Sequence, residues 1–129
     1  MNTKTKEREN GTETTNAPHG WLVTVNASGE MSREPFDPCN SLRQLQQTVD
    51  GYIELHSLRR RYDCFCNDEG RLKGLSVNEP ITVLYGHDLV CGDVAICTHD
   101  ADGETMGLTD AEAVDVMSTL REFGAVEKA

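Results

Sequence analysis

Cysteine and histidine side chains are the residues of this sequence that are best suited to hold a metal ion. Two thiols, Cys64 and Cys66, are separated by one residue, and a later segment adds four further donors: His87, Cys91, Cys97 and His99. Thiolates and imidazoles are the usual protein ligands of Zn²⁺, but zinc-binding cysteine pairs normally have two to four residues between them. One intervening residue is poor spacing for a single ion on a flat strand. We therefore predict no metal site and interpret Cys64, Cys66, Cys91 and Cys97 as packing residues.

Two other kinds of chemistry lack a local signature. A cysteine nucleophile with a histidine base would need a recognisable motif, and no nucleophile elbow is present. The acidic turn at 100–104 begins like a calcium loop, with Asp100, Asp102 and Glu104, but Gly103 comes too early. Ala111 also stands where the bidentate acid of such a loop is required. We therefore predict no catalytic residues and no cofactor, and we expect that the protein is not an enzyme.

The only basic cluster is Arg59-Arg60-Arg61. Guanidinium groups match the geometry of phosphates and carboxylates, so these arginines are the candidate ligand-binding residues for an anion. A solvated loop that pairs with nearby carboxylates is the alternative. A small-ligand pocket would combine these arginines or Lys73 with an aromatic side chain, for which there are three candidates: Tyr52, Tyr62 and Tyr85.

Charge and cysteine content limit which binding partners and which cellular compartment we expect. The 129 residues include 12 basic and 22 acidic ones, a net charge of −10. Affinity for nucleic acid comes largely from lysine and arginine, so direct nucleic-acid binding is not expected, nor is binding to anionic membranes. An odd count of five cysteines argues against a disulfide framework. With no apolar signal segment, we expect a cytoplasmic protein with reduced thiols.

The elements that would position these residues form one domain. Residues 1–18 lack aromatic and branched aliphatic side chains and are expected to be a disordered arm, with a domain at 19–125 and a tail at 126–129. Hydrophobic patterns predict strands at 21–25, 30–36, 52–56, 62–66 and 89–97. Helices are predicted after Asn40 or Ser41, over a short segment that begins at Pro80 and ends at Gly86, and after the capping box Thr109-Asp110-Ala111-Glu112.

This order predicts an α+β fold. We expect a mostly antiparallel sheet of about five strands with two main helices packed on it, on one face. Pro35 and Pro38 should confine the strand at 30–36 to an edge or an end, and an exposed edge there would support a homodimer. Gly70 should supply a positive φ in the turn at 67–70, and Gly92-Asp93 should bend the last strand.

Four segments resemble a known pattern in both order and spacing: GYIE at 51–54, NDEGRLKGL at 67–75, NE at 78–79 and GDV at 92–94. They are similar to the uncharacterised family catalogued as domain of unknown function 3846, over roughly residues 20–108. Ser76 stands in place of the family's usual proline. Members occur in phages, plasmids and gut bacteria, often near antirestriction genes. The resemblance therefore implies a small accessory protein of a mobile element, without an established activity.

Three functions follow as hypotheses. The first is a counter-defence protein of antirestriction or anti-CRISPR type that binds a host protein, such as a defence nuclease, through an acidic surface. Its candidate partner-binding residues lie on the last helix and the preceding turn: Asp110, Glu112, Asp115, Glu122, Asp100, Asp102 and Glu104. The second is a module that binds or sequesters a nucleotide. The third is a zinc or thiol protein.

Overall fold

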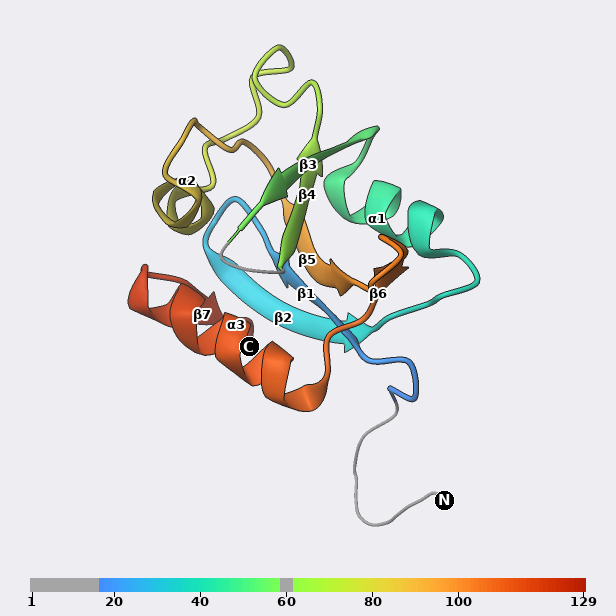
Figure 1. Cartoon of the computed structure of the whole chain (residues 1–129). Coiled ribbons are helices and arrows are strands. Elements are labelled where there is room, and N and C mark those ends of the chain that lie inside the picture. Colours follow the sequence, from blue (N-terminus) through green and yellow to red (C-terminus); the bar gives the residue numbers. More distant parts are fainter. Residues whose placement is uncertain (1–16, 59–61) are drawn as a thin grey trace.

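The computed structural model describes residues 17–58 and 62–129, which contain seven strands and three helices (Figure 1). The strands are β1 (Trp21–Val25), β2 (Glu30–Pro35), β3 (Ile53–Ser57), β4 (Asp63–Asn67), β5 (Val94–His99), β6 (Thr105–Met106) and β7 (Val126–Glu127). The helices are α1 (Ser41–Val49), α2 (Glu79–Tyr85) and α3 (Asp110–Glu122). This confirms the α+β class, with seven strands where about five were expected.

All seven strands belong to one sheet. Its order is β3-β4-β5-β1-β2-β7, and β6 pairs with β5 outside this path. Every pairing is antiparallel except that of β2 with β7, which is parallel. The sheet is therefore mostly antiparallel, as predicted.

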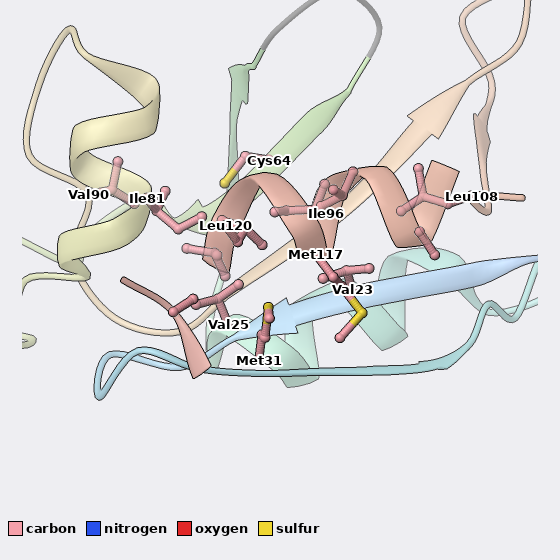
Figure 2. Close-up of a cluster of buried hydrophobic side chains, with 14 of the residues drawn as sticks. Val23, Val25, Met31, Cys64, Ile81, Val90, Ile96, Leu108, Met117 and Leu120 are labelled. Carbon is pink, nitrogen blue, oxygen red and sulfur yellow. The ribbon is translucent and has the colours of Figure 1, made fainter. Parts of the chain in front are cut away.

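The helices cover both faces of this sheet, so the prediction of one covered face is wrong. On one face, Met117 and Leu120 of α3 and Ile81 of α2 pack with β1 side chains such as Val23 and with Ile96 of β5 (Figure 2). On the other face, α1 contributes a side chain to a smaller cluster: Leu45 with Leu22, Phe65, Ala95 and Cys97. Alternate residues of a strand point to opposite faces, which explains why β4 is buried at all five positions.

Two short strands were not predicted. β6 and β7 have two residues each, and both exist only through pairing, β6 with β5 and β7 with the start of β2. A tail was predicted at 126–129, and this segment includes β7. β7 pairs with Glu30 and Met31, so β2 is not the edge of the sheet at its first residues. Pro35 ends β2, as the proline argument allows.

The last long strand begins later than predicted. β5 begins at Val94, and residues 89–93 precede it as loop with an isolated bridge from Cys91 to Val77. Gly92 has φ +88, and a Cβ there would lie 2.9 Å from Cδ1 of Leu75. The predicted bend at Gly92-Asp93 is therefore present, but it lies before the strand and not within it.

The glycine of the turn at 67–70 has a different role from the predicted one. Gly70 is absent from the glycines with positive φ; a Cβ there would lie 3.0 Å from the carbonyl oxygen of Cys91. The turn is closed instead by Asn67, whose carbonyl accepts from Gly70 N at 3.1 Å. The requirement for glycine here is therefore close approach to the segment before β5.

The longest helix begins as predicted. Thr109 and Glu112 make both hydrogen bonds of a capping box, and the buried residues of α3 repeat at helical spacing: Ala113, Val116, Met117 and Leu120. In α1, Leu45 and Val49 are buried, whereas Leu42 is exposed. No helix within the described ranges is long and apolar enough to cross a membrane.

Candidate functional site

Asn67 joins the end of α1 to the end of β4. Its Nδ2 donates to the carbonyl oxygens of Val49 and Asp50, both at 3.1 Å, and its Oδ1 accepts from Glu69 N at 2.8 Å. The contact is close, because a Cβ on Gly51 would lie 2.6 Å from Nδ2. This network places the αL residue Asp50, the only described non-glycine residue with positive φ, beside the segment that follows β4.

Asn78 joins three other segments in the same way. It is fully buried, and its Nδ2 donates to the carbonyl oxygens of Val25, Asn26 and Gly92 at 3.0–3.2 Å. Asn78 is the N-cap residue of α2 by position, but its side chain makes no cap hydrogen bond. Its amide instead fixes the β1–β2 turn and the bend before β5 against the start of α2.

Between these two asparagine networks lies a pocket of about 300 Å³, here called the motif pocket. Four separate segments line it: Ala27; Thr48, Val49 and Asp50; Asn67, Lys73, Leu75 and Ser76; Gly92 and Asp93. Two of the four segments that carry the family resemblance, 67–75 and 92–94, thus meet at one hollow. Local sequence reasoning missed Asp50, Ser76 and Asp93 as site residues, because only the fold brings them together.

The motif pocket carries two carboxylates and one ammonium group. Asp93 is exposed, and its Oδ1 accepts from Ala27 N at 3.0 Å, which orients the carboxylate and leaves its second oxygen for other contacts. Asp50 is exposed at the end of α1, where the helix dipole is negative. Lys73 is half exposed, with Nζ 3.7 Å from Glu69 Oε1, an exposed pair that holds it weakly. The pocket therefore favours hydrogen-bond donors over anions.

A larger hollow of about 500 Å³ lies beside the start of β1, between residues 17–20 and 105–110. Its lining is mainly apolar or backbone, and its ionisable side chains are His19 and Asp110. The carboxylate of Asp110 already accepts a hydrogen bond from Trp21 Nε1 at 2.6 Å. Since fewer polar side chains converge here, the motif pocket is the stronger candidate site.

The acidic residues proposed for partner binding on α3 are partly engaged within the fold. Asp110 accepts from Trp21, Glu112 belongs to the capping box, and Asp115 accepts through Oδ2 from the hydroxyl of Tyr62 at 2.9 Å. Asp115 and Glu122 are exposed and lie opposite the buried stripe of the helix. Asp115 and Glu122 are thus the two α3 acids that remain best placed for a partner.

The acidic turn before β6 is a closed structural turn. Asp100 Oδ1 accepts from the backbone nitrogens of Asp102 and Glu104, both at 2.9 Å, and Gly103 has φ +85. These bonds explain the spacing of the acidic residues without a bound calcium ion. Asp102 and Glu104 are exposed.

The described candidates for a small-ligand pocket lie in different surroundings. Arg59, Arg60 and Arg61 lie outside the described residues, so their prediction stays a prediction. Tyr62 bonds to Asp115, and the ring of Tyr85 packs against His56. Of the candidates that the structure describes, which are Lys73, Tyr52, Tyr62 and Tyr85, Lys73 alone lines the motif pocket.

The strand cysteines are buried and lie on both faces of the sheet. Cys64 and Cys66 belong to the core beneath α3, whereas Cys97 belongs to the core beneath α1, so these three thiols cannot share one ion. Burial raises the pKa of Cys97 to about 12, with Asp63 adding to the effect. His99 Nδ1 lies 2.8 Å from Asp63 Oδ2, but the raised pKa leaves Cys97 as a poor nucleophile.

The fold and the motif pocket define a small α+β domain with helices on both faces of a mostly antiparallel sheet. The chain belongs to the family described as "Domain of unknown function (DUF3846)", whose profile matches residues 21–121. Searches of curated proteins and of solved structures gave no match.

Proposed function

We propose that this protein is a non-enzymatic binding protein that takes a small polar ligand in the motif pocket. The observation that carries the proposal is the convergence of four polar side chains, from three segments distant in sequence, on one hollow of about 300 Å³: Asp50, Lys73, Ser76 and Asp93. Ligand sites are typically concave and contain a few convergent polar groups of this kind.

The charges of the pocket indicate the class of ligand. Two carboxylates and the carboxyl end of α1 face one ammonium group, so a ligand that offers hydrogen-bond donors gains more than an anionic one. Lys73 and the hydroxyl of Ser76 can complement an acceptor on the same molecule. We expect a nucleoside-like ligand to bind more tightly than the corresponding nucleoside phosphate.

Calorimetry with matched pairs of probes tests this proposal. Each nucleoside would be titrated into the full chain beside its 5′-monophosphate, and the same titrations would be repeated on Lys73→Gln. We expect binding to at least one nucleoside, weakened about tenfold by loss of one charge-assisted hydrogen bond in Lys73→Gln. Lys128→Gln, which removes an exposed lysine outside the pocket, should bind like the wild type.

Two results would overturn the proposal. The first is the absence of binding heat with every probe at millimolar concentration. The second is equal affinity of the wild type and Lys73→Gln for a probe that does bind, because that ligand would then occupy a different site.

A second candidate function is favoured by the exposed acids of α3. Here the protein is an accessory protein of a phage or mobile element that blocks a host defence nuclease by presenting acidic groups to its basic groove. The support is the exposure of Asp115 and Glu122 on the outer side of α3, in a chain of net charge −10. Opposite charges on two partners speed association and favour the correct orientation.

Inhibition of purified restriction nucleases tests this second candidate. A variant with Asp115→Asn and Glu122→Gln should lose inhibition that the wild type shows at low salt, because the nuclease groove loses two of its charge contacts. The matched control, Asp68→Asn with Glu79→Gln, changes the net charge equally at exposed positions outside α3 and should still inhibit. Inhibition that survives equally in both variants, or is absent from the wild type, contradicts the candidate.

A further inference from the structure

The pairing of β3 with β4 brings three different metal-ligand types together at the edge of the sheet. Glu54 lies opposite Cys66 in the register, and His56 follows Glu54 by two residues on the same face. One oxygen, one nitrogen and one sulfur atom of these side chains all lie within 4.8 Å of one another. Within residues 17–58 and 62–129, no other three histidine, cysteine or acidic side chains meet this criterion.

The distances between these atoms fit the ligands of a tetrahedrally coordinated metal ion better than they fit direct hydrogen bonds between the side chains. His56 Nε2 lies 3.9 Å from Glu54 Oε2, which is too long for a hydrogen bond. Two ligands of a tetrahedral Zn²⁺ with bonds near 2.1 Å are about 3.4 Å apart. A small inward rotation of the two side chains would therefore reach the ligand spacing.

The three side chains also differ in ways that suit an open site. Cys66 is 3 % exposed and supplies a sulfur from the core, whereas Glu54 lies on the edge strand and is half exposed. The ring of His56 is held against Tyr85 of α2, with centroids 4.4 Å apart. An ion can thus enter from solvent past Glu54 and meet a sulfur and a nitrogen whose positions are restricted by packing.

We propose that Glu54, His56 and Cys66 form a binding site for a divalent transition metal, with Zn²⁺ as the best match and solvent as the fourth ligand. Zinc accepts sulfur, nitrogen and oxygen together, and sites with three protein ligands keep one position open. Hard cations such as Mg²⁺ and Ca²⁺ prefer oxygen alone, so the thiol and imidazole select against them.

Without a bound cation, the surroundings of Cys66 disfavour the thiolate form of its side chain. Burial first, and then the carboxylate of Glu54, raises the pKa of Cys66 to about 12. A carboxylate beside a buried thiol is unfavourable for thiolate formation, but a bound dication reverses this effect and deprotonates a coordinating thiol.

Cobalt substitution tests the site directly. The full chain, stripped of metal with a chelator, would be titrated with Co²⁺, which adopts zinc sites and gives a sulfur-to-metal charge-transfer band in the near ultraviolet. We expect the band to saturate at one Co²⁺ per chain and to disappear on addition of Zn²⁺. Cys66→Ala should abolish the band, and Glu54→Gln and His56→Gln should each weaken Co²⁺ binding by about tenfold or more.

A matched control separates this site from the other thiols. Cys97→Ala removes a buried cysteine from the opposite face of the sheet and should keep the band and the affinity. Circular dichroism of each variant reports folding, and Glu54→Gln gives a reading at an exposed edge position even if Cys66→Ala does not fold. A wild type without a band, a band that survives in Cys66→Ala, or unchanged affinity in Glu54→Gln would overturn the proposal.

Discussion

Asn67 and Asn78 are buried polar residues whose amides replace secondary-structure hydrogen bonds between loops. Together they donate to five backbone carbonyls, from Val49 and Asp50 in one case and from Val25, Asn26 and Gly92 in the other. Buried carbonyls without donors destabilise a fold, so these side chains determine how the loops around the motif pocket are held. Both belong to segments of the family resemblance, which gives those asparagines a structural reason to be there.

Replacement of Asn78 by alanine should lower stability substantially. Two buried carbonyls, those of Val25 and Gly92, lose a donor, at about 1–3 kcal/mol each, whereas the carbonyl of Asn26 keeps the hydrogen bond from Gly29 N. Removal of Asn78 Oδ1, which has no partner among the described residues, offsets part of the loss. We expect the free energy of unfolding to fall by about 2–4 kcal/mol, measured by urea denaturation.

Asn40→Ala is the matched control for this substitution. Asn40 is also an N-cap asparagine without a side-chain cap hydrogen bond, but it is exposed. Its replacement should cost less than about 1 kcal/mol. Equal losses in the two variants would mean that the amide of Asn78 does not hold the three segments together.

At the scale of elements, the best predictions come from signals that lie within the element itself. β1 has the predicted bounds, Trp21–Val25, because its run of apolar and β-branched residues is a local pattern. The capping box of α3 is likewise made by residues three apart. β6 and β7 could not be found this way, because two-residue strands are defined by their partners and not by their own side chains.

The sequences of the central strands indicate that helices cover both faces of the sheet, although only one covered face was predicted. β4 reads Asp-Cys-Phe-Cys-Asn and β5 reads Val-Ala-Ile-Cys-Thr-His, and neither alternates between apolar and charged residues. Continuous runs of this kind are typical of strands buried on two faces. The motif pocket left no comparable signal, since its lining residues are separated by up to 66 positions, from Ala27 to Asp93, and meet only through the fold.

At the scale of the whole molecule, the sheet divides the interior into two cores that α1 covers on one side and α2 and α3 on the other (Figure 1). The cysteines are distributed over both cores and two loops. Cys64 and Cys66 lie in the larger core, Cys97 in the smaller one, and Cys91 is buried at the loop before β5. Only Cys39, in the loop before α1, is exposed among the five.

Thiol reactivity in the native state should therefore report the integrity of both layers in one measurement. Burial raises the pKa of Cys64 well above its ordinary value and that of Cys66 and Cys97 to about 12, so these thiols are protonated and inaccessible near neutral pH. With Ellman's reagent at pH 8 and no metal, we expect one of the five thiols to react rapidly and the other four to react only as the fold opens. The substitution Cys39→Ser should remove the fast phase of this reaction. Addition of denaturant should make all of the remaining thiols reactive. A second fast thiol at Cys64, Cys66 or Cys97 in the native wild type would show that the core containing it is open to solvent. Its position, found by mass spectrometry, would identify which helix leaves the sheet uncovered.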